Sequence, residues 1–376
     1  LKWDCAKNLR DTADILLAGN PKTYEFIENM IANACKSVRS RRIHIGMDEA
    51  WGIGLGNYLS INGYTKSSEI LTLHLEKVTD ICIKHGLKPF MWSDMFFQTS
   101  SGSTIGGNFA YDCAADNIAF RNIPNQMQLV YWDYESTKKE KYVANIKKHK
   151  SFGIIPAFAG GIWIWNMFGV NYGKSIIETN AALQACKEEG IKEIFATLWL
   201  DDGAESNIFA SLPGLALYAE HTYNKVVELD NLKNTVYRCT KIRYEDFLGL
   251  SEIDEIPGCP KNNLEFNNPS KCFLWQDILL GIFDLYAKNF DYEAYYKILA
   301  DKFAKQKLSG EMGDLIFSVP ESLCRVLSVK CGIGNLIREA YLEKDTIKLN
   351  LIAIKTLPKL SALVNELRLT HRKVWM

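Results

Sequence analysis

The feature that most constrains the fold is a repeated alternation of helical and strand-like segments in the first 200 residues. Apolar residues recur at helical spacing in four segments, at 24–39, 70–85, 138–149 and 174–189. Short apolar segments typical of strands occur five times, at 41–47, 87–92, 127–132, 154–165 and 194–199. This alternation predicts a parallel β/α architecture.

The residues that follow each strand favour a TIM-type (β/α)8 barrel over an open doubly wound sheet. Each strand leads into acidic or aromatic residues at its carboxyl end, where active sites lie in the barrel fold. These residues are Asp48, Glu49, Trp92, Ser93, Asp94, Trp132, Asp133, Tyr134, Trp163, Trp165, Trp199 and Asp201. A complete barrel has eight strands, so we expect a companion N-terminal segment or a second chain to complete it.

The sequence changes character after about residue 218. Amphipathic helices are predicted at 243–248, 277–287, 292–307 and 352–367, and strand patterns are not seen there. We therefore predict an α/β protein of two domains, with about five β/α units of the barrel in residues 1–220 and an α-helical C-terminal domain in residues 221–376.

Composition excludes several classes of partner. Lys plus Arg equals Asp plus Glu at 44 each, so no net charge draws the chain to nucleic acid or to an anionic membrane. The sequence has no apolar run long enough for a membrane span, and its first residues do not resemble a signal peptide. The ten cysteines form no CxxC pair, which argues against a zinc site and predicts reduced thiols in a cytoplasmic protein, with a set of disulfides as the alternative. A homo-oligomer formed through the predicted helical domain is an open alternative.

The strongest local signal is the pair of adjacent acids at the end of the first strand, Asp48 and Glu49. Neighbouring side chains of a regular strand point to opposite faces, so both acids can face one substrate only if the strand breaks before them. Gly46 and the glycines of 51–56 favour such a break. The alternative is that one of the acids caps the next helix.

Four ordered motifs resemble glycoside hydrolase family 20, the exo-β-N-acetylhexosaminidases. They are His44-x-Gly46-x-Asp48-Glu49, the segment 90–94 (Phe-Met-Trp-Ser-Asp), the segment 131–134 (Tyr-Trp-Asp-Tyr) and the segment 197–205 around Trp199 and Asp201. The residues of these motifs are most similar to those of a bacterial branch of N-acetylglucosaminidases in which a helical domain follows the barrel. This resemblance covers roughly residues 1 to 215 and implies that the chain corresponds to the C-terminal part of a longer enzyme.

The resemblance implies a retaining mechanism in which the substrate supplies its own nucleophile. The 2-acetamido oxygen attacks the anomeric carbon and forms an oxazolinium ring. Glu49 then protonates the leaving oxygen and later activates water, while Asp48 stays ionised and orients the acetamido group. The expected substrate is a glycan with a terminal β-linked N-acetylglucosamine or N-acetylgalactosamine, and no cofactor is needed. The arginine that holds the terminal sugar in this family comes from the first strand, which is not present in this sequence.

The remaining candidate residues are assigned by the same resemblance. Trp92, Trp132 and Trp199 are expected to form an aromatic cage, with Trp163 and Trp165 as further members, although a tryptophan in a barrel is often a core residue. A tyrosine contacts the acetamido oxygen; Tyr131 and Tyr134 compete, and we favour Tyr134. Asp201 is expected to bind sugar hydroxyls. Asp94 and Asp133 are substrate-binding candidates that helix capping would also explain, and His44 is a candidate that a supporting or core histidine would also explain.

Two rival functions remain open. One is a non-catalytic carbohydrate-binding protein on a decayed barrel, and the other is a glycosidase that uses an enzymic carboxylate as its nucleophile. Sequence does not give the linkage, nor the preference between the two amino sugars.

Overall fold

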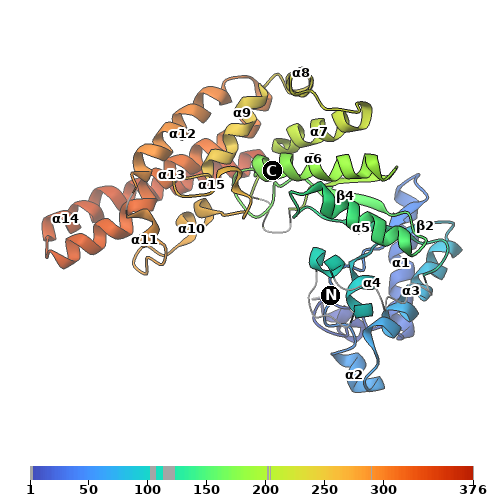
Figure 1. The fold of residues 1–376 in the computed structure, drawn as a ribbon. Coiled ribbons are helices and arrows are strands. Elements are labelled where there is room, and N and C mark those ends of the chain that lie inside the picture. The colour runs from blue at the N-terminus through green and yellow to red at the C-terminus, as the bar shows by residue number, and fades with distance from the viewer. Residues whose placement is uncertain are drawn as a thin grey trace. The chain divides into compact units, whose positions relative to one another are not determined.

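The computed structural model describes residues 3–101, 107–112, 123–200, 203, 205–288 and 290–375 (Figure 1). The chain forms two compact units. The first comprises Leu1–Gly160 and Gln184–Phe195, and the second comprises Gly161–Leu183 and Ala196–Met376.

The five strands form one sheet in which the spatial order equals the chain order. They are β1 (Arg42–His44), β2 (Lys88–Trp92), β3 (Gln128–Trp132), β4 (Ala157–Gly161) and β5 (Ile194–Thr197). The pairs β1–β2, β2–β3 and β3–β4 are parallel. A sequential parallel order is that of a barrel, whereas a doubly wound sheet reverses its order at a switch point. The predicted partial TIM barrel is therefore confirmed.

The predicted helices precede or connect these strands. They are α1 (Pro21–Ser37), α3 (Ser67–Lys84), α5 (Lys139–Ser151) and α6 (Tyr172–Glu188). Asn20 begins α1 because its side chain accepts the amide hydrogen of Lys22, and Pro21 takes the first helical position, where a missing N–H costs nothing. Ile27 and Ile31 of α1 pack with Val78 and Cys82 of α3 in a buried cluster. Hydrophobic packing of this kind fixes the helices of the first unit.

The inner face of the sheet carries a second cluster, which positions the candidate site. Its buried members are Phe90 of β2, Val130 and Trp132 of β3, and Ala157 and Ala159 of β4, and Trp92 and Tyr134 pack against it. These residues alternate along their strands, so they lie on one face. Small residues of β4 therefore face the large aromatic residues of β2 and β3.

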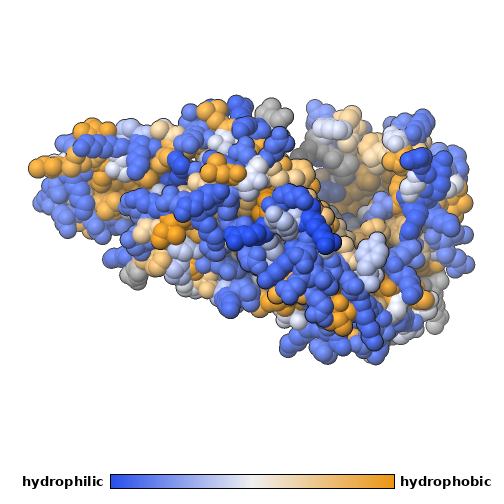
Figure 2. Space-filling model, turned by 90° about the horizontal axis from the view of Figure 1, so that it is seen from above, coloured by the Kyte–Doolittle hydropathy of each residue, from blue (hydrophilic) through white to orange (hydrophobic). Residues whose placement is uncertain are grey.

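The second unit is mainly helical, as predicted. Its helices after the sheet are α7 (Leu212–Tyr223), α8 (Leu229–Thr240), α9 (Tyr244–Leu248), α10 (Pro269–Trp275), α11 (Asp284–Ala287), α12 (Tyr292–Lys307), α13 (Glu311–Leu342), α14 (Thr346–Leu351) and α15 (Leu357–Trp375). The orange and red helices α12, α13 and α15 lie side by side in Figure 1. Apolar side chains remain exposed around α14, including Leu342, Ile347 and Ile354, and Figure 2 shows this end dotted with hydrophobic residues. The domain boundary at residue 220 stays a prediction.

Two local predictions were wrong. The strand predicted at 154–165 is a strand only over Ala157–Gly161. The helix predicted at 277–287 exists only as Asp284–Ala287, because the Asp277 carboxylate accepts the amide hydrogens of Leu279 and Leu280 and holds a turn there.

Cysteine pairing and membrane spans can be examined over the described residues. Nine cysteines are described there, all as free thiols; their reduced state stays a prediction. Within the same ranges, no helix has the length and apolar character needed to cross a bilayer.

Candidate active site

The strand break predicted before the two acids is present. β1 ends at His44, and Gly46, Met47 and Glu49 have φ angles of 72°, 67° and 49°. Backbone in the left-handed region turns the chain sharply, and it costs energy for residues other than glycine. Asp48 and Glu49 are both exposed. The turn therefore releases both acids from strand geometry and leaves them open to solvent.

Aromatic residues lie on the inner face of the sheet near this turn. The imidazole of His44 packs on Trp92 with ring centroids 4.2 Å apart, and Trp132 stacks on Tyr134 with centroids 5.3 Å apart. Trp92 and Tyr134 are half-buried, whereas Trp132 is buried. The Nδ1 atom of His44 accepts the amide hydrogen of Gly46. His44 thus supports the start of the turn, and a contact between His44 and substrate stays a prediction.

Residues 46–49, which include Asp48 and Glu49, are called the acidic turn. Asp94 lies behind this turn and is fully buried. It is the first residue of α4 (Asp94–Ser101). Its Oδ2 accepts the amide hydrogen of Glu49 at 3.1 Å, and its Oδ1 accepts the indole hydrogen of Trp132 at 3.2 Å. Burial, with a smaller contribution from the charge of Asp48, raises the pKa of Asp94 to about 7. The carboxyl group of Asp94 therefore joins the acidic turn to the aromatic face.

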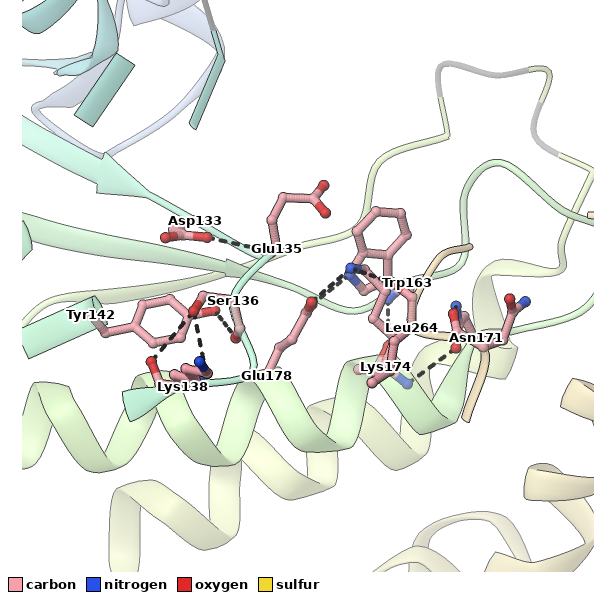
Figure 3. A network of polar contacts seen from close by, with 12 residues as sticks. Asp133, Glu135, Ser136, Lys138, Tyr142, Trp163, Asn171, Lys174, Glu178 and Leu264 are labelled. Atoms are coloured by element: carbon pink, nitrogen blue, oxygen red, sulfur yellow. Dashed lines mark hydrogen bonds and ion pairs between the residues drawn. The ribbon is translucent and has the colours of Figure 1, made fainter. Parts of the chain in front are cut away.

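Tyr131 and Asp133 point to the opposite face of β3, which disfavours a contact with substrate on the inner face; that contact stays a prediction. Tyr131 is fully buried, and its hydroxyl donates to Asp133 Oδ2 at 2.8 Å while accepting from the Asn145 side chain of α5 at 3.0 Å. The other Asp133 oxygen accepts the amide hydrogen of Glu135 (Figure 3). Strand alternation places Tyr131 and Asp133 toward α5 and leaves Tyr134 on the face of Trp132.

Sequence reasoning missed a buried network that supports this end of the sheet. The hydroxyl of Ser93, between Trp92 and Asp94, lies 2.9 Å from His149 Nε2 and 3.0 Å from both the Tyr111 hydroxyl and the Val130 carbonyl oxygen. His149 Nδ1 lies 2.8 Å from the Asn145 carbonyl, and burial lowers the pKa of His149 to about 4. The ring is therefore neutral near pH 7, with its hydrogen on Nδ1. One sequence signal was available: Ser93 lies between Trp92 and Asp94 at the end of a strand, so its side chain is expected to point to the opposite face from theirs.

The remaining candidate tryptophans belong to the second unit. Trp163 is 2% exposed, and its indole donates to Glu178 Oε2 at 2.8 Å (Figure 3). Trp165 and Phe266 stack on it with ring centroids 4.3 Å and 5.3 Å away. So little of Trp163 is accessible that the structure favours a core role for it, and its sugar contact stays a prediction. Trp165 is also buried, and Trp199 follows β5 half-buried; their sugar contacts stay predictions. Asp201 lies outside the described residues.

No group of three or more metal-ligating side chains occurs in the part of the chain that the structure describes. The groups present at this end of the sheet are carboxyl groups, a buried aspartate that accepts a backbone amide hydrogen, and aromatic faces. Two exposed adjacent acids with a half-buried aromatic wall suit proton transfer to a sugar and stacking on its ring.

Comparison with known proteins identifies two domains in the chain. Residues 2–151 match the model for the glycosyl hydrolase family 20 catalytic domain, and residues 245–376 match the model for the glycoside hydrolase 20C C-terminal domain. No curated protein matches the chain. The two domain matches, in the order expected for a barrel followed by helices, assign the chain to glycoside hydrolase family 20.

Proposed function

We propose that the protein is an exo-acting β-N-acetylhexosaminidase that releases terminal β-linked N-acetylglucosamine or N-acetylgalactosamine with retention of configuration. The observation that carries this proposal is the broken end of β1, where Asp48 and Glu49 are both exposed. Trp92 and Tyr134 are half-buried on the inner face of the neighbouring strands. This arrangement offers an acid, an anion and aromatic surfaces to one sugar.

In this proposal Glu49 is the general acid and then the general base. A proton passes from Glu49 to the glycosidic oxygen as the bond to the anomeric carbon breaks, and the acetamido oxygen of the substrate forms the new bond to that carbon. Water later opens the oxazolinium ring and returns a proton to Glu49. Asp48 accepts the acetamido N–H and stabilises the positive charge that develops on the ring.

Trp92 and Trp132 are proposed to hold the acetamido group against the anomeric carbon, and Tyr134 to donate to its oxygen. Tyr134 is favoured over Tyr131 because the Tyr131 hydroxyl is engaged with Asp133 and Asn145 behind the sheet. Holding the nucleophile in a near-attack geometry is worth several orders of magnitude in rate. The stack of Trp132 on Tyr134 would fix both rings in place.

A further segment or chain is proposed to complete the barrel and to supply the sugar-binding arginine. The sheet of the described residues has five parallel strands, whereas a closed barrel of this type has eight. Intact mass and an SDS gel of the protein isolated from its natural source would test this. A single species of the mass of this chain, with full activity, would contradict it.

The activity test uses the complete natural protein and two chromogenic substrates, the N-acetyl-β-glucosaminide and the β-glucoside without the acetamido group. We expect cleavage of the first and at least about 100-fold slower cleavage of the second, because only the first carries the nucleophile. Equal rates would favour an enzymic carboxylate nucleophile. Calorimetric binding of a chitobiose-type ligand without product would favour a carbohydrate-binding protein.

Two substitutions separate the roles of the acids. Glu49→Gln should lower kcat by about 10²–10⁴-fold for poor leaving groups and much less for a dinitrophenyl leaving group, which needs no proton. Asp48→Asn should lower kcat for every leaving group by about 100-fold or more and should weaken binding of a thiazoline analogue of the oxazolinium ring. Full activity in both variants would exclude this site.

A further inference from the structure

Asp94 is the residue that physically connects the acidic turn with the aromatic face, and the proposed reaction leaves it without a role. Its two oxygens accept from two different elements: the backbone of Glu49, after β1, and the indole of Trp132, at the end of β3. Both donors belong to residues that the proposed mechanism uses. The Asp94 side chain itself is completely buried, so it has no direct access to a sugar.

Burial of this carboxyl group is energetically unfavourable unless hydrogen bonds within the protein compensate for the lost contact with water. Burial raises the pKa of Asp94, and the neighbouring charge of Asp48 acts in the same direction. A polar group in such a place is tolerated when it is hydrogen-bonded. Asp94 is hydrogen-bonded at both oxygens, and a neutral residue of similar shape could not accept from both donors, since an asparagine has one oxygen and one donating nitrogen.

The acidic turn needs an anchor of this kind. Met47 and Glu49 are non-glycine residues with positive φ angles, and such strained backbone persists only when its surroundings hold it in place. The hydrogen bond from the Glu49 amide to Asp94 acts within this strained turn. Loss of that bond would let the backbone of Glu49 move relative to Trp132.

We propose that Asp94 is a positioning residue that sets the distance between the acid Glu49 and the aromatic residue Trp132 by accepting one hydrogen bond from each. The inference rests on the proposed function and adds a specific role to a residue that does not touch the substrate. A displacement of about 1 Å of a catalytic group can lower the rate about 100-fold. The role predicts an effect on kcat rather than on substrate affinity.

The test compares Asp94→Asn with Asp254→Asn in the complete natural protein. Asp254 is a matched control in the second unit: it is also buried, its oxygens accept the amide hydrogens of Ser270 and Gly169, and burial raises its pKa to about 6. We expect Asp94→Asn to lower kcat about 100-fold with KM changed less than threefold. Asp254→Asn should keep kcat within about threefold, even if its stability falls.

A second measurement separates positioning from folding. Hydrogen exchange of the peptide amides at residues 45–51 should become faster in Asp94→Asn and stay unchanged in Asp254→Asn, because only the first variant releases the Glu49 amide. Trp132→Phe, which removes the indole donor and leaves the bond to Glu49, should lower kcat without faster exchange in that segment.

The outcomes are distinct for the two proposals. If the wild-type protein does not cleave the N-acetyl-β-glucosaminide, the proposed function fails, whereas the exchange measurement still tests the anchor. If the wild-type protein is active and Asp94→Asn keeps its kcat, or if both aspartate variants lose kcat equally, the positioning role is overturned. Unchanged exchange at 45–51 in Asp94→Asn would overturn it as well.

Discussion

The ammonium group of Lys174 lies 2.8 Å from the carboxylate of Glu178, and the two side chains are only 3% and 2% exposed. They are four residues apart on α6 and form an ion pair inside the second unit. The same carboxylate accepts the Trp163 indole hydrogen, and Lys174 Nζ lies 4.6 Å from the centre of the Trp163 ring (Figure 3). One buried ion pair therefore organises the residues after β4.

Removal of one partner of this pair should be strongly destabilising. Glu178→Ala leaves a buried ammonium group without its carboxylate, and we expect a loss of about 3–5 kcal/mol in the free energy of unfolding, measured with urea. The exposed pair Lys297–Glu293 on α12 is the control, and Glu293→Ala should cost less than about 1 kcal/mol. Similar losses in both variants would contradict the assigned burial.

The two tyrosines of β3 and its loop should respond differently to loss of the hydroxyl group. Tyr134→Phe should lower kcat/KM for the N-acetyl-β-glucosaminide by about 10–100-fold, because the proposed partner of its hydroxyl in the reaction is the substrate. Tyr131→Phe removes the hydroxyl that donates to Asp133 Oδ2 and accepts from the Asn145 side chain, and it should cost about 1–3 kcal/mol of stability. Steady-state kinetics and urea unfolding of both variants test these two roles. A large loss of kcat/KM in Tyr131→Phe and none in Tyr134→Phe would assign the substrate contact to Tyr131 instead.

Ser93 should contribute to stability out of proportion to its size. Ser93→Ala removes a hydroxyl that contacts His149, Tyr111 and the Val130 carbonyl, and unsatisfied buried partners cost about 1–3 kcal/mol. Ser60→Ala is the control, because Ser60 is exposed and bonds only weakly to Gly56, at 3.4 Å. A loss below about 0.5 kcal/mol at Ser93 would show that the network does not hold this end of the sheet.

Asp254 should make the stability of the second unit pH-dependent. Burial raises its pKa from 3.8 to about 6, so between these values the folded state keeps a proton that the unfolded chain has released. Its contribution to stability is complete below pH 4 and is lost as the pH rises to 6, by at most about 3 kcal/mol. The difference in unfolding free energy between wild type and Asp254→Asn should fall across this interval and level off above it. A difference that does not vary with pH would contradict the assigned burial.

Two glycines should respond oppositely to a methyl group. A Cβ atom at Gly173, in the first turn of α6, would lie 2.5 Å from the Asn262 Cα, so Gly173→Ala must displace backbone and should cost about 1–3 kcal/mol. Gly332, inside α13, has no atom within 4 Å of such a Cβ. Gly332→Ala should stabilise the protein by about 0.5–1 kcal/mol, because alanine restricts the unfolded chain more. The change in melting temperature of each variant gives the sign of its effect on stability.

The sequence predicted the sheet well because strand and helix periodicities are local properties. The order of the five strands and the break before Asp48 followed from apolar spacing and Gly46. The role of Trp163 was not predicted. The strand β4 ends at Gly161, so regular strand alternation no longer applies two residues later, and the indole N–H of Trp163 is directed to Glu178.

Other features depend on contacts that no local pattern carries. The partners of Asp94 come from residues 45 positions earlier and 38 positions later, and an aspartate at a helix start is equally typical of a cap. The 32-residue helix α13 was missed because Pro320 lies inside it and normally indicates a helix end. Tyr131 could have been assigned from sequence, since its neighbour Trp132 must face the other side of the strand.

The positive φ angles of Met47 and Glu49 have a consequence for how this protein would fail. A turn held in a conformation that its own residues disfavour relaxes as soon as its neighbours loosen, well before the sheet beneath it melts. Mild heating or a remote packing defect would therefore abolish the proposed catalytic activity in molecules whose circular dichroism spectrum is still that of the native protein.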